Sequence, residues 1–321
     1  MTPKDYQDGV YLAAYLAPFR RWLDEPEVTE VMVNQTGDVW IETTGQTHMQ
    51  RVDAPEVTAD LLARLASQVA RYAHQGINRE SPLLAATLPD GSRIQIIGPP
   101  ATRRGWALAI RRHGLVSRPL EAFATGPLKP PPLRDLQQEQ DEARADPIAF
   151  LRRGVIERRT ILISGGTSSG KTTFLNALLE AVPASERIVV VEDTPEIVVT
   201  QPNAVGLVAV KGALGEARVT VNELLQASLR MRPDRLIVGE IRGEEAVTFL
   251  RAINTGHPGS FTTIHANSPQ GALDQLALMV LQSGLGLNRQ EIIDYSSRLI
   301  DIVVQVSRLD GTRGIEDIWL P

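Results

Sequence analysis

Short apolar runs alternate with helical stretches in the second half of the chain. The runs are TILIS, RIVVVE, RLIVGE and SFTTIH, and the stretches with helical spacing lie near residues 172–182, 221–231, 244–253 and 271–282. Apolar runs separated by helices are typical of a parallel or mostly parallel sheet with helices on both faces. The pattern therefore predicts an α/β fold for this half.

The first half has a different pattern, in which one helical stripe precedes short β-branched segments. The stripe consists of Tyr11, Leu12, Tyr15, Leu16, Phe19, Trp22 and Leu23. We expect it to dock on its own domain, with a membrane surface or a partner as the alternative. VTEVMVN and DVWIE predict a hairpin, a helix follows near residues 59–72, and SRIQIIG and WALAIRR predict two further strands. Together these elements predict a smaller α+β domain.

A proline cluster marks the boundary between the two halves. Its members are Pro127, Pro130, Pro131 and Pro132. Prolines lack an amide donor and favour extended backbone, so this stretch cannot form a central strand or a helix interior. We predict an N-terminal α+β domain over residues 1–113, a linker over 114–146 and the α/β domain over 147–321. Residues 133–145 form either a short exposed helix or a solvated connector.

Composition and charge narrow the classes of function. The 321 residues are 43% apolar and 22% charged, which is typical of a globular protein with room for about two domains. Thirty-three Lys and Arg against 38 Asp and Glu give a net charge of −5, which disfavours nucleic acid as the chief partner. There is no cysteine, so disulfides, thiolate zinc sites and cysteine nucleophiles are excluded. The sequence has neither a run of ~20 apolar residues nor an export signal, which predicts a cytoplasmic protein.

The strongest chemical signal is a glycine-rich loop that fits G-x-x-x-x-G-K-[ST]. It lies between the apolar run ILIS and the amphipathic stretch TTFLNALLEAV, where backbone amides and a helix N-terminus can receive phosphate oxygens. We expect Lys171 to reach the β- and γ-phosphates of ATP and the Thr172 hydroxyl to bind Mg²⁺. The predicted nucleotide-binding residues are Gly165, Gly166, Thr167, Ser168, Ser169, Gly170, Lys171, Thr172 and Thr173.

Acidic residues end two further predicted strands. Glu192 and Asp193 follow RIVVV, and Glu240 ends RLIVGE, where Gly239 occupies the position at which an acid is usual. The carboxyl ends of parallel strands meet at the edge of the sheet where ligands bind. We expect Glu240 to orient the attacking water and Glu192 to contact the metal or the water, with an exchange of these roles as the alternative.

A histidine at the end of SFTTIH lies at the same predicted edge. We expect His265 to hydrogen-bond the γ-phosphate or a catalytic carboxylate, with a histidine satisfied by backbone as the alternative. Metal binding by His257 and His265 is disfavoured, because no further ligand set accompanies them.

Arginines complete the set of candidates, because a guanidinium can contact phosphate charge from the same or a neighbouring subunit. The candidates are Arg93, Arg111 and Arg242, with a surface ion pair as the alternative for each. Four others are expected to be solvated: Arg103, Arg104, Arg152 and Arg153.

Four segments carry a family resemblance: GGTSSGKTT, VVVEDTPEI, RPDRLIVGEIRGEEA and TGHPGSFTTIHANS. In this order they resemble the Walker A, Asp box, Walker B and His box of the secretion ATPase superfamily. Over essentially the whole chain the sequence is most similar to type IV secretion traffic ATPases of the VirB-eleven and TrbB kind. The resemblance implies a RecA-like P-loop domain, nucleotide bound between two domains, and a hexameric ring attached peripherally to the inner membrane through other secretion components. It also implies that Arg93 and Arg111 contact nucleotide phosphates, with Arg112 as an alternative to Arg111.

The motifs and the resemblance together predict Mg-dependent ATP hydrolysis that powers substrate translocation or pilus assembly in a type IV secretion system. Movement of one domain against the other is the expected mechanical output. The alternatives are a pilus-retraction or type II secretion ATPase, a DNA translocase, and a nucleotide-gated scaffold. The absence of cysteine argues against type II members that carry a four-cysteine zinc module.

Overall fold

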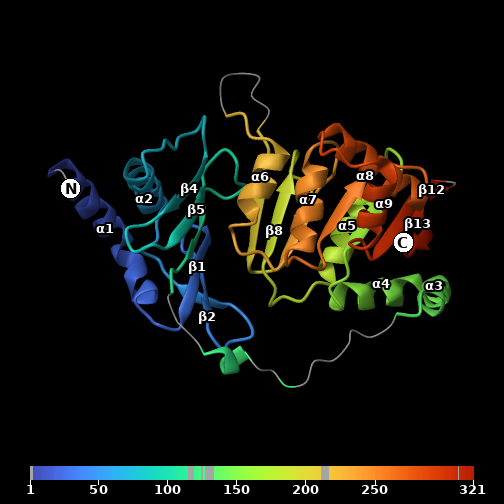
Figure 1. Cartoon of the computed structure of the whole chain (residues 1–321), viewed down its shortest axis with the longest axis horizontal. Helices are drawn as coiled ribbons and strands as arrows, with labels where there is room; N and C mark the ends of the chain where they lie inside the picture. Colours follow the sequence, from blue (N-terminus) through green and yellow to red (C-terminus); the bar gives the residue numbers. More distant parts are fainter. Residues whose placement is uncertain (1–2, 115–118, 124–125, 127–133, 211–216, 310) are drawn as a thin grey trace.

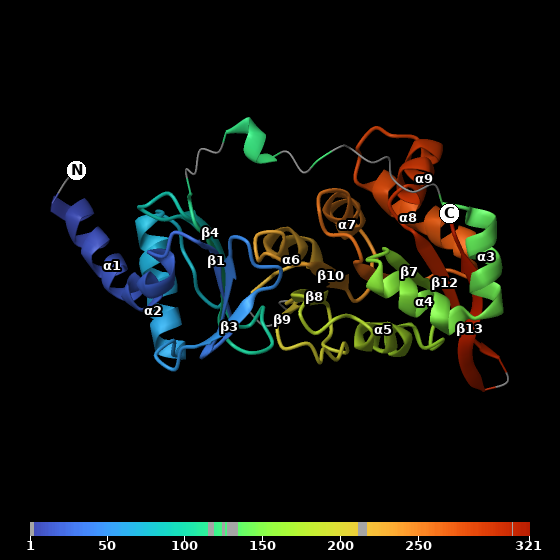
Figure 2. The ribbon, with the colours of Figure 1, turned by 90° about the horizontal axis from the view of Figure 1, so that it is seen from below.

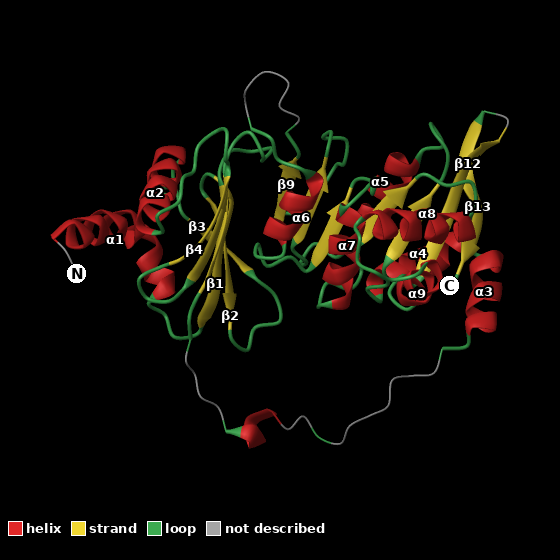
Figure 3. Cartoon of the chain, turned by 45° about the horizontal axis from the view of Figure 1, so that its top comes forward, coloured by secondary structure: helices red, strands yellow, loops and turns green. Residues whose placement is uncertain are grey.

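Two β-sheets organise the chain, one in each half, as the computed structural model shows (Figure 3). The structure describes residues 3–114, 119–123, 126, 134–210, 217–309 and 311–321. We refer to residues 3–114 as the N-terminal module and to the described residues from 134 onward as the C-terminal module. The two modules lie side by side along the longest axis of the molecule (Figure 1).

The N-terminal module is built on a six-stranded sheet in the order β3-β2-β1-β6-β5-β4, in which all paired neighbours are antiparallel. The strands are β1 (Val28–Gln35), β2 (Asp38–Thr43), β3 (Gln50–Asp53), β4 (Leu83–Thr87), β5 (Arg93–Ile97) and β6 (Ala107–Arg111). The predicted hairpin is confirmed as β1 and β2, which turn at Gly37 with a φ of +73°. Strands β3 and β4 were not predicted from the sequence.

Two helices, α1 (Pro3–Leu23) and α2 (Ala59–Tyr72), pack on one face of this sheet. Leu12, Phe19 and Trp22 of α1 are buried in the same cluster as Leu62 of α2. The apolar stripe therefore docks on its own module as expected, except that Tyr11 remains 58% exposed.

The C-terminal module contains a seven-stranded sheet in the order β13-β12-β7-β11-β10-β8-β9. All paired neighbours are parallel except β12 and β13, so the mostly parallel sheet predicted from the sequence is confirmed. The strands are β7 (Ile161–Ser164), β8 (Ile188–Glu192), β9 (Ala204–Val208), β10 (Arg235–Val238), β11 (Phe261–Ile264), β12 (Ile302–Leu309) and β13 (Thr312–Trp319).

Helices cover both faces of this sheet (Figure 2). Alternate residues of each strand point to opposite faces. Accordingly, Val189 belongs to the hydrophobic cluster that includes residues of α6, α7, α8 and α9, whereas Val190 belongs to the cluster that includes residues of α3, α4 and α5. The helices are α3 (Leu136–Ala145), α4 (Pro147–Ile156), α5 (Lys171–Glu180), α6 (Val221–Ser228), α7 (Glu245–Asn254), α8 (Pro269–Gln282) and α9 (Arg289–Ser297).

The segment between the modules is described only in part. A 3-10 helix spans Leu120–Phe123, and the polar run after the prolines forms α3, so the helical alternative holds there. Asp135 caps α3 by accepting from the Gln138 amide. The four prolines on which the predicted linker depends lie outside the described residues.

The modules share a hydrophobic core. The face of the N-terminal sheet opposite α1 and α2 supplies Met32, Trp40 and Ala109 to the cluster that contains Leu207 and Leu224. The backbone continues this contact, because residues 101–103 run antiparallel to β9: Arg103 donates to Gly206 (3.0 Å) and Val208 donates to Ala101 (3.0 Å). The N-terminal module therefore covers the β9 edge of the C-terminal sheet.

A fully buried arginine contacts both modules and fixes their relative position. Arg187 lies directly before β8 and donates to Asn34 Oδ1 at 2.5 Å and to the Met231 carbonyl at 2.9 Å. Asn34 in turn donates to Asn203 Oδ1 at 3.0 Å. Burial lowers the pKa of Arg187 to about 10, so the guanidinium stays charged at neutral pH.

Replacing Arg187 by methionine should lower the free energy of unfolding by about 2–4 kcal/mol, because the buried partners of the guanidinium lose their donors. Urea unfolding measures this change. Arg152→Gln, on an exposed position of α4, is the matched control and should stay within about 0.5 kcal/mol of the parent. An Arg187→Met protein as stable as the parent would contradict the role of this contact.

Candidate nucleotide site

The glycine-rich loop joins β7 to α5 and has a shape that depends on two of its glycines. A Cβ added at Gly165 would lie 2.4 Å from Ser169 Oγ and 2.5 Å from the Val306 carbonyl oxygen. Gly170 has a φ of +96° directly before α5, in the left-handed region that favours glycine. A side chain at either position would change the path of the loop.

The loop also leaves hydrogen-bond donors available for an anion. Helix α5 begins without a side-chain cap at Gly170, so no side chain occupies its first amides. Ser169 Oγ is buried and has no hydrogen-bond partner among the described residues. Such uncapped amides at a helix N-terminus, together with a buried hydroxyl and a close backbone turn, fit the oxygens of a phosphate group. Thr167, Ser168 and Thr173 are exposed, and Thr172 is half-buried.

Lys171 is held inside this loop. Its side chain is buried, and Nζ lies 3.0 Å from the Gly165 carbonyl, 3.1 Å from the Gly166 carbonyl and 3.3 Å from His265 Nδ1. Burial lowers the pKa of Lys171 below its ordinary value, and the negative charge of Glu240 offsets part of this effect. The ammonium group is thus positioned to exchange its carbonyl contacts for phosphate oxygens.

The predicted acid and histidine meet beside this lysine. Glu240 Oε1 lies 2.8 Å from His265 Nε2, and Glu240 Oε2 accepts from Arg242 Nε at 2.9 Å. Arg242 also donates to Asp193 Oδ2 at 2.7 Å. Lys171, His265, Glu240, Arg242 and Asp193 therefore form a continuous chain of polar contacts along the carboxyl edge of the sheet. Arg242 thus forms ion pairs with carboxylates, which is the alternative role that we considered for it above.

Glu192 has a different position from the one expected. Its side chain is 2% exposed, Oε1 accepts from the amides of Glu196 (2.9 Å) and Ile197 (2.7 Å), and Oε2 pairs with Arg103. The prediction that Glu192 contacts magnesium finds no support in this geometry, because both oxygens are engaged by the protein. The Glu192 side chain also lies against Gly239, where an added Cβ would be 3.2 Å from Glu192 Cγ. A side chain at position 239 would therefore press against Glu192.

Arg103 was expected to be solvated, and this expectation is wrong. Its side chain is only 24% exposed, and Nη1 donates to the Ile197 carbonyl at 2.7 Å in addition to the ion pair with Glu192. Arg103 thereby links the N-terminal module to the loop after β8. Only the antiparallel run of residues 101–103 along β9 brings these groups together, and the sequence gives no local signal for it.

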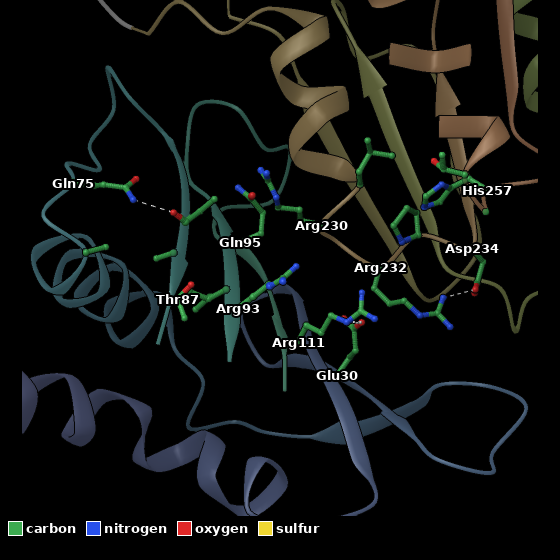
Figure 4. A pocket seen from close by; sticks show the side chains of 18 of the residues that line it. Glu30, Gln75, Thr87, Arg93, Gln95, Arg111, Arg230, Arg232, Asp234 and His257 are labelled. Carbon is green, nitrogen blue, oxygen red and sulfur yellow. Dashed lines mark hydrogen bonds and ion pairs between the residues drawn. The ribbon is translucent and has the colours of Figure 1, made fainter. Parts of the chain in front are cut away.

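Arg93 and Arg111 lie at a cavity of about 1140 Å³ between the modules (Figure 4). The cavity is lined by Arg158, Asp234 and His257, which precede β7, β10 and β11, so it lies at the amino edge of the sheet. The phosphate loop follows β7 at the opposite edge.

A four-residue strand such as β7 spans roughly 13 Å, and no residue of the loop lines the cavity. Within one chain, Arg93 and Arg111 therefore do not meet the loop. The predicted contact of these arginines with nucleotide phosphates therefore requires the loop of a neighbouring copy. The two histidines are also separated: His257 lines the cavity, where its Nδ1 lies 3.0 Å from the Ala252 carbonyl oxygen, whereas His265 lies beside the loop.

The loop follows a parallel strand, contains Lys171 and lies beside an acid and a histidine at the same sheet edge, which fits the kind of nucleotide site that the P-loop motif predicts. The model of the type II/IV secretion system protein family matches residues 13–309, and the chain belongs to this family.

Curated relatives and one solved structure agree with this assignment. The type IV secretion system protein VirB11 of Bartonella quintana is 36% identical and that of Brucella suis 38% identical, each over 95% of this chain and over 91% and 89% of the relative. The crystal structure of the VirB11 ATPase from the Brucella suis type IV secretion system in complex with sulphate has a TM-score of 0.91 at 34% identity. The match covers 99% of this chain and 97% of that chain. The resemblance found in the sequence is confirmed.

In the part of the chain that the structure describes, no helix is both long enough and apolar enough to cross a bilayer.

Glu30, at the cavity, gives a pH-dependent prediction. It is 7% exposed, and burial raises its pKa from 4.5 to about 7 despite the nearby Arg111. The folded protein therefore holds the Glu30 proton more tightly than the unfolded chain, and stability falls as the pH rises from about 4.5 through 7. This change corresponds to roughly 3 kcal/mol. Between pH 5 and pH 8, Glu30→Gln should lose less unfolding free energy than the parent in urea titrations, by most of this amount. Equal losses in the two proteins would contradict the raised pKa.

Proposed function

We propose that this protein is a Mg-dependent ATPase that powers substrate translocation or pilus assembly in a bacterial type IV secretion system. The single observation that carries the proposal is the glycine-dependent loop that holds Lys171 beside Glu240 through His265. The VirB11 relatives, similar over nearly the whole chain, supply the link to type IV secretion.

In this proposal residues 147–321 form a RecA-like P-loop domain, residues 1–113 form a smaller α+β domain, and residues 114–146 join them. The sheet order and the helices on both faces of the larger sheet support this division. The long connection allows the N-terminal domain to pack beside the edge strand β9 rather than over the carboxyl ends of the strands, where the loop lies.

The chemistry follows from the contacts at the loop. Residues 165–173 receive the phosphates, and Lys171 neutralises charge on the β- and γ-phosphates. Magnesium, when bound with the nucleotide, would be held by the Thr172 hydroxyl and would neutralise further phosphate charge. Glu240 orients the attacking water, because its carboxylate is fixed by His265 on one oxygen and Arg242 on the other.

His265 connects the lysine to this carboxylate and is the group that responds to the γ-phosphate. Its ring lies within 3.4 Å of Lys171 Nζ and 2.8 Å of Glu240. When Lys171 turns to a phosphate, the contact between Lys171 and His265 changes, and the position of Glu240 changes with it. The state of the nucleotide is thus transmitted to the strand ends.

The arginine cavity supports assembly into a ring, for which we propose a hexamer at the inner face of the membrane, in contact with other secretion components. One copy presents Arg93 and Arg111 at one edge of its sheet and a phosphate loop at the other. Two different surfaces that meet head to tail form a heterologous interface, which builds a ring where the rotation between copies closes. Because the two modules of one chain share a core, we place the mechanical movement between copies rather than within one chain.

Lys171→Ala and Glu240→Gln should each lower steady-state ATP hydrolysis by about 100-fold or more, because one removes the phosphate-binding ammonium and the other the carboxylate that orients water. Phosphate release by the purified proteins measures this change. Glu240→Gln should still bind a non-hydrolysable ATP analogue, and Arg152→Gln should hydrolyse ATP at the parent rate. Hydrolysis of ATP by Lys171→Ala at the parent rate would contradict the proposal. Secretion that survives Glu240→Gln in cells would favour a scaffold over a motor.

A further inference from the structure

Strand β12 runs past the end of its neighbour β7 and continues beside the phosphate loop. The two strands are parallel, and their pairing ends at Gln305 with Ser164, the last residue of β7. Residues 306–309 of β12 and their partners in β13 therefore extend roughly 13 Å beyond that end of the sheet (Figure 3). The phosphate loop begins at the same level, because Gly165 directly follows Ser164.

The extension contacts the phosphate loop at two glycines. A Cβ added at Gly165 would lie 2.5 Å from the Val306 carbonyl oxygen, and one added at Gly170 would lie 2.8 Å from Arg313 Cδ and 3.6 Å from Arg313 Nε. Only glycine lets the loop approach the extension this closely. The guanidinium of Arg313 therefore lies beside the turn that leads into α5.

Two arginines lie opposite each other in this extension. In the register of β12 and β13, Arg308 pairs with Arg313, and Val306 pairs with Ile315. Because side chains alternate along a strand, all four lie on one face of the sheet, where Val306 and Ile315 pack in the cluster that contains Leu175 of α5. Like charges directly opposite on paired strands are destabilising. An anion beside the two arginines would relieve this repulsion.

The protein itself does not supply that anion. The side chains of Arg308 and Arg313 are exposed, and neither forms a hydrogen bond or an ion pair with any residue that the structure describes. By contrast, Arg242 at the same edge of the sheet is engaged by two carboxylates. The two guanidiniums of the extension are therefore available to a ligand of the loop.

The position of Glu240 gives the direction of a nucleotide in this loop. Strands β12 and β13 lie on one side of β7 in the sheet, whereas β10, which Glu240 follows, lies on the other side. In the hydrolysis that we propose, the water held by Glu240, the γ-phosphorus and the leaving oxygen lie in line. The β- and α-phosphates then extend away from Glu240, toward the side of the loop where Arg313 lies.

We propose that Arg313, supported by the charge of Arg308, binds the α-phosphate of the nucleotide held by the phosphate loop of the same chain. The inference rests on the proposed function and adds a residue of β13 to its site. A guanidinium can donate two parallel hydrogen bonds to phosphate oxygens. Because ATP and ADP both carry an α-phosphate, this contact holds the nucleotide before and after hydrolysis and does not act on the transferred group.

Arg313→Gln tests the inference through binding. It should weaken the binding of ADP and of a non-hydrolysable ATP analogue by the same factor, about 10-fold, because both lose the same charged contact. Isothermal titration calorimetry on the full chain with magnesium measures both affinities. The KM for ATP should rise by a similar factor, while kcat stays within about threefold of the parent, as expected when a contact is equal in the ground and transition states.

Matched variants separate the phosphate contact from other roles of the same side chain. Arg313→Lys keeps the charge without the planar fork and should lose less affinity than Arg313→Gln. Arg308→Gln should also lose less, because Arg313 is the arginine that lies against Gly170. Arg152→Gln should bind both nucleotides as the parent does. Arg313→Gln should unfold at no lower urea concentration than the parent, because it removes a contact between like charges.

Inorganic tripolyphosphate distinguishes a phosphate contact from a contact with the nucleoside. It has phosphates but neither ribose nor base, and Arg313→Gln should weaken its binding as it weakens that of ADP. Tripolyphosphate binding at the parent level, together with weakened ADP binding, would place Arg313 at the nucleoside and overturn the assignment.

Three other results would also overturn the inference: unchanged affinity of Arg313→Gln for both nucleotides, weaker binding of the ATP analogue alone, or a lower kcat at parent affinity. Each of them leaves the proposed function intact. Failure of the proposed function has a different signature, in which the parent does not hydrolyse ATP or Lys171→Ala hydrolyses it as fast as the parent.

Discussion

The buried contact between the two modules determines which surfaces of this chain can meet. Arg187 is enclosed between β8 and the N-terminal sheet, and its guanidinium donates to Asn34, Asn203 and a backbone carbonyl. Because this network and a shared apolar core hold the N-terminal module on the β9 edge, the module cannot also cover the phosphate loop of its own chain. The nucleotide site of one copy is therefore open on its outer side.

Because the strands are parallel, the two ends of the strands carry different groups of residues. Residues that follow the strands form the edge that holds the candidate catalytic residues Lys171, Glu240 and His265. Residues that precede the same strands form, with the N-terminal sheet, the arginine cavity. A parallel sheet separates these two edges by the length of its strands. In the function that we propose, the loop at one edge and the arginines at the other are two halves of a site that two copies complete. Head-to-tail association of copies brings such half-sites together.

Much of the catalytic edge could be predicted from the sequence, because local patterns and strand direction determine it. The glycine spacing located the loop around Lys171, and the ends of apolar runs located Glu240 and His265. The same reasoning identified the β1–β2 hairpin and the mostly parallel sheet. The short strands β3 and β4 were missed, since the exposed and polar QRVD and the alanine-containing LLAAT lack the β-branched pattern.

Contacts between distant segments could not be predicted in this way. The pairing of Arg103 with Glu192 depends on the docking of residues 101–103 against β9, and the sequence near either residue does not encode it. The position of Arg93 and Arg111 depends on the same docking. Strand-end position alone placed Glu192 at the catalytic edge, but the direction of its side chain is set by the amides of Glu196 and Ile197.

The central claim is that each nucleotide is enclosed by two copies of the chain. A cryo-electron microscopy structure of the assembled protein with magnesium and a non-hydrolysable ATP analogue tests it most directly. We expect the terminal phosphate within hydrogen-bond distance of Lys171 of one copy and of Arg93 or Arg111 of the next. A closed site in which all contacts to that phosphate come from a single chain would contradict the account.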